Sequence, residues 1–218
     1  MAHQFHLTLI RMIQTRWKIE YIRRGLSTVI IFLNGPPQSG KDTMAKFMVS
    51  MLPNAKELKF SKPLKDACKV LIPLGEEYWK DQLEELKDVP LDITHGCETT
   101  ARDMQIHLSE KMMKPMFGDD IFGQVMAMRI AQTPAKHIII SDGGFLGEAK
   151  QVRRSNANCR AVHITRPGYD FAGDSRNYVD YKSIDIPVTP VSNEYDLELY
   201  EAQTKRILTK WKLLQNPG

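Results

Sequence analysis

The chain has 218 residues, of which 42% are hydrophobic and 26% are charged, which is typical of a globular domain with room for an insertion. This composition excludes disordered, collagen-like and disulfide-stapled proteins. The three cysteines form no Cys-x-x-Cys pair, so we expect reduced thiols and a cytoplasmic location. The longest strongly apolar run, 29–33, is far shorter than the ~20 residues of a membrane span, and no membrane partner is expected.

Positive charge is concentrated at the start of the chain. Residues 1–27 contain five Arg or Lys and one Glu, a net charge of +4, which equals the charge of the whole chain. Residues 28–218 therefore sum to zero. We interpret 1–27 as a basic N-terminal extension, either an amphipathic helix or a frayed segment. The alternative, an arm that contacts DNA weakly, stays open because basic segments attract polyanions.

The first predicted element is a buried strand. Residues 28–34 form an apolar, β-branched run that suits a strand covered on both faces of a parallel sheet. The hydrophobic period then changes and predicts a helix over 41–52, stopped by Pro53. The next expected elements are a short strand at 57–60, a helix after Pro63, an exposed helix at 76–88 and a loop at 89–100.

The second half of the chain continues this alternation of strands and helices. Residues 101–114 carry Met and Leu at helical spacing, which predicts a helix ended by Pro115. The later expected elements are a helix at 122–132, a strand at 137–142, a helix over 148–154, a strand at 161–165 and a final helix over 197–214. Residues 166–183 are polar and Gly-rich, and we expect a mobile surface segment outside the core. The alternation predicts a doubly wound α/β domain.

The stretch Gly35-Pro-Pro-Gln-Ser-Gly-Lys-Asp-Thr43 carries the clearest chemical signal. It fits G-x-x-x-x-G-K, the phosphate-binding P-loop, in the strand–loop–helix context that this motif requires. Glycines allow close backbone approach, and loop amides at a helix N-terminus form an anion nest. The expected ATP contacts are Gly35, Pro36, Gln38, Ser39, Gly40, Lys41, Asp42 and Thr43. The alternative is a Gly-rich turn that only caps the helix.

Asp42 interrupts the usual order of the motif, in which a hydroxyl residue directly follows the lysine. Phosphate would repel a carboxylate, so Asp42 is expected to face away and Thr43 to be the Mg²⁺ ligand. Lys41 supplies a mobile positive charge for the β- and γ-phosphates.

The P-loop resembles that of nucleoside monophosphate kinases, and more specifically that of the bacteriophage deoxynucleoside monophosphate kinases. The resemblance covers about residues 28–210. It is carried by Ser39-Gly-Lys-Asp-Thr43, Phe60-Ser-Lys-Pro-Leu-Lys-Asp66, Ser109-Glu110, Lys114-Pro115, Phe117-Gly118, Ile140-Ser-Asp142, Thr165-Arg-Pro-Gly168 and Asn193, which fits a final-strand ending. It implies a three-layer P-loop NTPase fold with a parallel sheet of about five strands. It also implies a single kinase domain over 28–218, with an acceptor-binding insert at about 61–133 and a lid at about 166–183.

The resemblance also implies roles for residues outside the P-loop. Asp142 would be a second Mg²⁺ contact at the carboxyl end of a strand, where open α/β sheets bind ligands; alternatively it caps a turn or helix. Arg166 and Arg176 would stabilise the transferred phosphoryl group from the lid. Lys65 and Arg102 would hold the acceptor phosphate, Arg102 also being counted among the catalytic residues. Each of these four cations is alternatively an ordinary surface residue. The family places Arg soon after the strand-end Asp, whereas Gly143 and Gly144 stand here.

These observations predict an ATP- and Mg²⁺-dependent kinase that converts a deoxynucleoside monophosphate to the diphosphate for viral DNA synthesis. Its partner would be a small nucleotide, and a monomer and a homodimer both remain open. One alternative is a kinase that phosphorylates the hydroxyl of 5-hydroxymethyluracil within phage DNA, which the basic arm favours. Another is a nucleotide-binding protein without turnover, which the retained Lys41, Thr43 and Asp142 disfavour.

Overall fold

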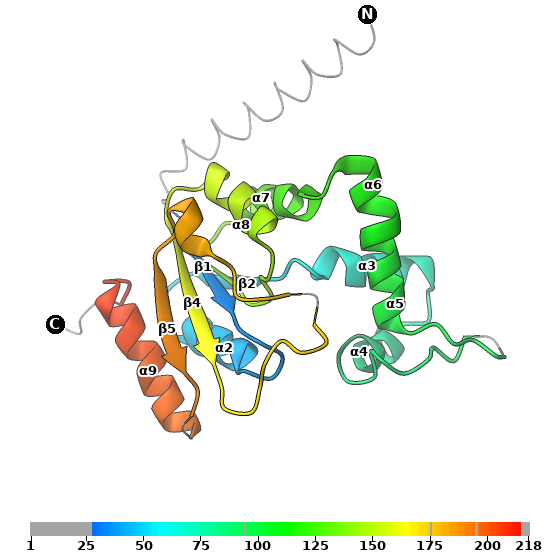
Figure 1. The fold of residues 1–218 in the computed structure, drawn as a ribbon, viewed down its shortest axis with the longest axis horizontal. Coiled ribbons are helices and arrows are strands. Elements are labelled where there is room, and N and C mark those ends of the chain that lie inside the picture. The colour runs from blue at the N-terminus through cyan, green and yellow to red at the C-terminus, as the bar shows by residue number, and fades with distance from the viewer. Residues whose placement is uncertain (1–27, 94, 175, 195, 215–218) are drawn as a thin grey trace, which may run out of the picture.

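The computed structural model describes residues 28–93, 95–174, 176–194 and 196–214, so the predicted basic extension at 1–27 lies outside the described residues. A five-stranded parallel sheet in the order β2-β3-β1-β4-β5 forms the centre (Figure 1). The strands are β1 (Val29–Asn34), β2 (Ala55–Leu58), β3 (His137–Ile140), β4 (Cys159–Thr165) and β5 (Val188–Ser192). The predicted α/β fold with a parallel sheet of about five strands is confirmed.

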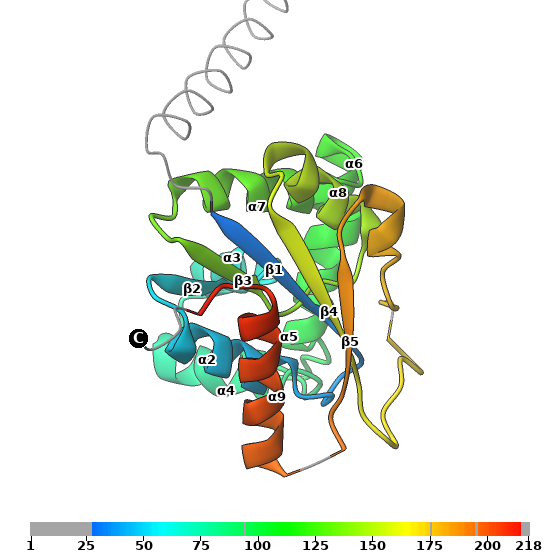
Figure 2. The same cartoon turned by 90° about the vertical axis from the view of Figure 1, so that its left-hand side faces the viewer.

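Helices cover both faces of this sheet (Figure 2). α2 (Lys41–Met51) and α9 (Leu197–Lys210) share one core with the sheet. α7 (Ile121–Gln132) and α8 (Leu146–Ser155) share the core on its other face. Every residue of β1 and β3 is buried, because helices cover both faces of these strands, and apart from Asn34 and His137 at their ends their side chains are apolar. Among the described residues, no helix has the length and apolar character that a bilayer crossing requires.

The remaining helices form a separate unit to one side of the sheet (Figure 1). They are α3 (Lys62–Leu71), α4 (Glu76–Glu84), α5 (Ala101–Ile106), the π-helix η1 (His107–Met113) and α6 (Lys114–Phe117). This helical unit has its own core around Cys68, Trp79 and Leu83. The prediction of an exposed helix at 76–88 is therefore corrected: α4 is shorter and buries one face, because Trp79 fills the centre of the unit.

Pro115 does not end the helix that begins at residue 101. The N–H of Lys114 bonds to the carbonyl of Ser109, five residues back, as in a π-helix. Pro115 then falls in the first turn of α6, where a missing N–H costs nothing. The helix ends instead at Phe117, before Gly118 with a φ of 97°, a backbone region that glycine enters without steric cost.

Residues 166–183 do not lie wholly outside the core, which corrects the prediction of a mobile surface segment. The end of this stretch leads into the 3₁₀-helix η2 (Tyr181–Ile184). Val179 is 4% exposed and Tyr181 is 1% exposed, and the Tyr181 ring lies 5.4 Å from the ring of Phe32. Two large apolar side chains are sufficient to anchor a segment whose composition is otherwise polar.

Candidate nucleotide-binding site

The loop 35–40 connects β1 to α2 at the carboxyl edge of the sheet, and both of its glycines are required by packing. A Cβ on Gly35 would lie 2.5 Å from the carbonyl oxygen of Ile164. Gly40 has a φ of 99°, and a Cβ there would lie 2.5 Å from Nδ2 of Asn193. The loop therefore passes so close to its neighbours that only glycine fits at its two ends.

Side chains that follow β4 and β5, and one side chain of α9, hold the loop by donating hydrogen bonds to its carbonyl oxygens. The bonds run from Asn193 to Ser39 (2.9 Å), from Arg166 to Gln38 (2.8 Å) and from Tyr200 to Gly40 (3.3 Å). The carbonyl of Gly40 also accepts a hydrogen bond from the N–H of Met44, which is the first i to i−4 hydrogen bond of α2. Among the described residues, the amides of 41–43 have no acceptor, and together with the helix dipole they favour an anion.

Lys41 lies inside this loop and is 8% exposed. Its Nζ donates to the carbonyl oxygens of Gly35 (2.8 Å) and Pro36 (2.6 Å). Burial and, next, the positive charge of Arg176 lower the pKa of Lys41, which nearby carboxylates raise, and the net result is a pKa of about 8. The lysine is thus a buried cation held by carbonyl groups alone, and a bound phosphate would stabilise its charge.

Asp42 and Thr43 occupy the first turn of α2 beside Lys41. The carboxylate of Asp42 forms an ion pair with Lys59 at 2.6 Å. Burial lowers the pKa of Lys59, but the hydrogen bond to Asp42 and further carboxylates outweigh it, so the pKa is raised overall. Asp42 is thereby directed to the end of β2, and the residue after it, the half-buried Thr43, provides a hydroxyl in the first turn of α2.

Asp142 follows β3 and connects two loops at the edge of the sheet. One carboxylate oxygen accepts from the N–H of Phe60 (2.8 Å), and the other accepts from the N–H of Ser61 (2.9 Å). These bonds turn the chain out of the sheet, which explains why β2 occupies 55–58 and not the predicted 57–60. Each oxygen has a second lone pair, so the carboxylate can also accept from a metal-bound water.

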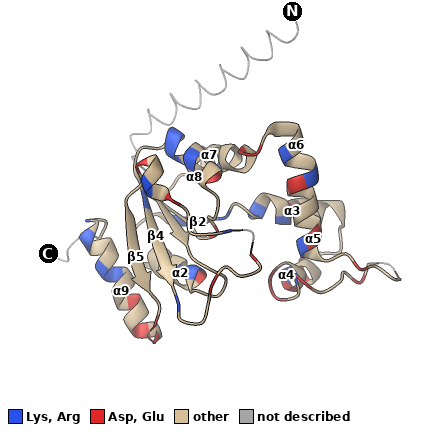
Figure 3. Cartoon of the chain, in the orientation of Figure 1, with Lys and Arg blue, Asp and Glu red and all other residues tan. Residues whose placement is uncertain are grey.

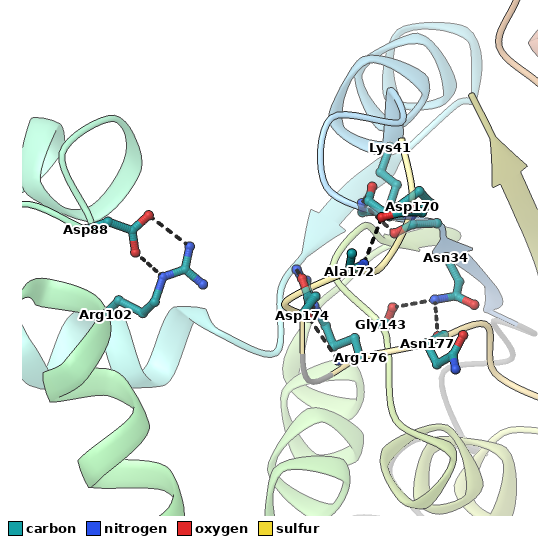
Figure 4. A network of polar contacts seen from close by, with 12 residues as sticks. Asn34, Lys41, Asp88, Arg102, Gly143, Asp170, Ala172, Asp174, Arg176 and Asn177 are labelled. Carbon is teal, nitrogen blue, oxygen red and sulfur yellow. Dashed lines mark hydrogen bonds and ion pairs between the residues drawn. The ribbon is translucent and has the colours of Figure 1, made fainter. Parts of the chain in front are cut away.

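Arg176 reaches the same edge from the segment after β4 (Figure 4). Its guanidinium donates twice to Asp174, from Nε to Oδ1 at 2.9 Å and from Nη2 to Oδ2 at 2.6 Å. These hydrogen bonds lower the pKa of Asp174 to about 2. Arg166, at the start of this segment, stacks on Tyr169 with 4.7 Å between its guanidinium carbon and the ring centroid. Both predicted arginines thus lie at the P-loop side of the molecule.

Arg102 and Lys65 lie in the helical unit and do not join this cluster. The guanidinium of Arg102 binds both carboxylate oxygens of Asp88, well apart from Arg176 in Figure 4. Lys65 pairs with Glu84 at 2.5 Å. Lys65 and Glu84 line a pocket of about 530 Å³ between α3 and α4. The charge of Arg102 nevertheless contributes to lowering the pKa of Asp174, as the smallest of the causes after the dominant hydrogen bonds from Arg176.

Sequence reasoning missed Asn34 and Glu148. Asn34 is fully buried at the end of β1, and its amide joins the loop after β3 to the segment that holds Arg176. The signal in the sequence that could have identified Asn34 is a polar residue at the end of an otherwise apolar strand. Burial and, next, the charge of Asp142 raise the pKa of Glu148, in the first turn of α8, to about 8 against nearby cations that lower it. No pattern in the sequence distinguishes Glu148 from a solvated helix residue.

A phosphate group, such as those of ATP, fits the residues at this edge. The hydroxyl of Ser39 is buried without a hydrogen-bond partner among the described residues. It lies beside Gly35, where a Cβ would come within 2.7 Å of it. An orphaned hydroxyl in a glycine-lined loop, next to a buried lysine and a helix N-terminus, suits a phosphate oxygen.

Comparisons with known proteins found no matching family model and no matching curated sequence. Among solved structures, a sugar kinase from Janibacter sp. has 14% identity and a TM-score of 0.43, covering 85% of this chain and 95% of its own. A tunicamycin resistance protein from Deinococcus radiodurans has 12% identity and a TM-score of 0.42, covering 88% and 99%. Thymidylate kinase from Candida albicans has 12% identity and a TM-score of 0.43, covering 85% and 93%. At such identities, function must be argued from the residues of this chain.

Proposed function

We propose that this chain is an ATP-dependent kinase that transfers the γ-phosphoryl group to a deoxynucleoside monophosphate. The observation that carries the proposal is the pair of buried groups in the P-loop, the Lys41 ammonium and the Ser39 hydroxyl, with Arg176 as a second cation that acts on Lys41. The two cations are close enough that Arg176 lowers the pKa of Lys41. Phosphoryl transfer requires positive charge around the moving group and little covalent chemistry from the protein, so two such cations suit this reaction.

Different residues at the P-loop would contact different parts of ATP and its metal ion. The amides of 41–43 and the Ser39 hydroxyl would bind the β- and γ-phosphates, and Lys41 would move from the loop carbonyls to a phosphate oxygen. Thr43 and Asp142 would hold Mg²⁺, Asp142 through water; the bound ion supplies further charge neutralisation. Arg176 would bind the γ-phosphoryl group as it is transferred. Arg166 would hold the loop in place through its hydrogen bond to the carbonyl oxygen of Gln38.

The acceptor is expected on the side of the helical unit. The charge of Arg102 contributes to lowering the pKa of Asp174, after the dominant hydrogen bonds from Arg176, and the planar guanidinium of Arg102 is suited to a phosphate. A phosphate monoester would replace Asp88 as the partner of Arg102. Lys65 lines the pocket between α3 and α4. If its ion pair with Glu84 opened, its ammonium group would add positive charge for the acceptor phosphate.

A second candidate function is phosphorylation of a hydroxymethylated base within DNA. It is favoured by the charge distribution, since a +4 extension precedes a neutral body. On the described helices, Lys and Arg are interspersed with Asp and Glu in the view of Figure 3. A duplex requires an extended positive surface, and the mixed charge of the body therefore supports the small nucleotide as acceptor.

The experiment that tests the proposal is a transfer assay with γ-labelled ATP and Mg²⁺. Each deoxynucleoside monophosphate and a duplex containing 5-hydroxymethyluracil serve as acceptors. We expect label in one or more diphosphates and none in the duplex. Label in the duplex alone would establish the second candidate function, and ATP binding without transfer to any acceptor would indicate a binding protein.

A further inference from the structure

The side chain of Arg176 fills the space that Gly144 leaves open. Gly144 lies in the loop after β3, and Arg176 comes from the segment after β4. A Cβ on Gly144 would lie 2.5 Å from Cγ, 2.6 Å from Cδ and 2.8 Å from Cβ of Arg176. These atoms form the stem of the arginine and not its flexible end. Any side chain at position 144 must therefore displace Arg176.

Asn34 holds the two segments together at this contact. Its Nδ2 donates to the carbonyl oxygens of Gly143 (3.1 Å) and Asn177 (3.2 Å), and its Oδ1 accepts from the N–H of Val179 (2.9 Å). The neighbours of both Gly144 and Arg176 are thus bound to one buried amide. The backbone of Arg176 is therefore held beside the loop after β3. The Arg176 side chain extends over Gly144, where there is no side chain to block it.

The guanidinium at the end of this path belongs to a partly buried charge cluster. Its counter-ion Asp174 has a side chain that is only 9% exposed. Arg176 also acts electrostatically on Lys41, and Asp142 acts on Arg176. An anion placed between the two cations would be attracted by both, which is the charge pattern that a terminal phosphate requires.

We propose that Gly144 is a positioning residue that seats Arg176 so that its guanidinium binds the γ-phosphate of ATP, with Asp174 as the counter-ion before nucleotide arrives. The identity of the anion rests on the proposed function. The packing of Arg176 against Gly144, which we call the seat, depends only on the contacts between the two segments. Arg176, from the segment after β4, thereby supplies a cation at the end of β3, where the two residues that follow Asp142 are glycines.

The test compares the affinities for ATP and ADP of purified variants, with Mg²⁺ and without acceptor, by isothermal titration calorimetry. Gly144→Ala and Arg176→Ala are each expected to weaken ATP binding by about tenfold or more, the effect of one charge-assisted hydrogen bond. ADP binding should change by less than about twofold, because ADP lacks the contacted phosphate. Gly147→Ala is the matched control, since a Cβ there has nothing within 4 Å.

The double variant Gly144→Ala/Arg176→Ala separates seating from a general loss of structure. It should bind ATP as Arg176→Ala does, and it should regain any melting temperature that Gly144→Ala loses, because truncating Arg176 removes the collision. Normal ATP affinity in a folded Gly144→Ala would overturn the seat, and normal affinity in Arg176→Ala would overturn the phosphate contact. Additive losses in the double variant would also contradict the proposal. Failure of the wild-type chain to bind ATP would instead refute the proposed function.

Discussion

At the scale of single residues, Lys41 is expected to serve function at a cost in stability. Its charge is buried against two carbonyl oxygens. Lowering the pKa from 10.5 to about 8 corresponds to about 3 kcal/mol of unfavourable free energy at neutral pH. We predict that Lys41→Met lowers the rate of phosphoryl transfer by about two to three orders of magnitude, while its urea midpoint at pH 7 equals or exceeds that of the wild type.

The pH dependence of stability provides a separate check on Lys41. Because the folded pKa lies below the unfolded value, the penalty is complete below pH 8 and is relieved as pH rises from about 8 to 10.5. The free energy of unfolding of the wild type should therefore rise relative to Lys41→Met over that interval. Parallel curves for the two proteins, measured by urea denaturation from pH 7 to 10.5, would show that Lys41 is not desolvated.

Thr43 and Asp42 differ in their expected importance, although they are neighbours. Asp42 is ion-paired with Lys59, and its side chain is 65% exposed, so this pair contributes at most about 1 kcal/mol. We predict that Thr43→Ala raises the Mg²⁺ concentration needed for half-maximal transfer far more than Asp42→Ala does. Titration of activity with Mg²⁺ measures this ranking. The reverse ranking would place the metal at the carboxylate.

At the scale of elements, the reliable predictions are those in which one local pattern decides the structure. The apolar runs of β1 and β3 and the strand–loop–helix setting of the P-loop require no knowledge of the rest of the chain. The strand β5 has no comparable pattern: it contains Pro190 at the edge of the sheet, where a missing N–H is tolerated. It was anticipated only from the resemblance around Asn193.

Other errors arise where a distant residue changes a local outcome. β2 is shifted from its predicted position because Asp142 binds the backbone after it. Pro115 is accommodated because the preceding turns adopt the π-helical register. The partner of Arg102 is Asp88, an acid in a loop 14 residues earlier, which sequence spacing alone does not bring beside it. Site residues within one motif can therefore be read from sequence, whereas contacts between segments cannot.

The junction around Asn34 yields a prediction for the segment after β4. In Asn34→Ala, the N–H of Val179 and two carbonyl groups lose their buried partner, at a cost of about 2–4 kcal/mol. We expect the Val179 amide to exchange with solvent much faster in this variant, as measured by hydrogen–deuterium exchange. Asn193→Ala is the control, because Asn193 donates to the carbonyl of Ser39 in the P-loop and not to the segment after β4. In this variant the Val179 amide should exchange at the wild-type rate.

At the scale of the whole molecule, the neutral body and the basic extension are expected to act independently. The P-loop begins at Gly35, and the contacts that hold it come from residues after 160. The proposed mononucleotide acceptor would likewise be bound by the body, through cations such as Arg102. We therefore expect residues 1–27, which lie outside the described residues, to have no role in transfer to a small nucleotide.

Deletion of residues 2–26 should therefore leave kcat/KM for the preferred monophosphate within a few-fold of the full chain. It should also leave the affinity for ATP unchanged, which shows that the truncated protein is folded. Any DNA binding by the full chain should be weak, insensitive to sequence and lost between low and physiological salt, because a net charge of +4 replaces few counterions. If the acceptor were instead a base in DNA, the truncation would abolish transfer to the modified duplex while sparing ATP binding. A parallel assay of both acceptors with both proteins therefore shows whether the extension takes part in acceptor binding.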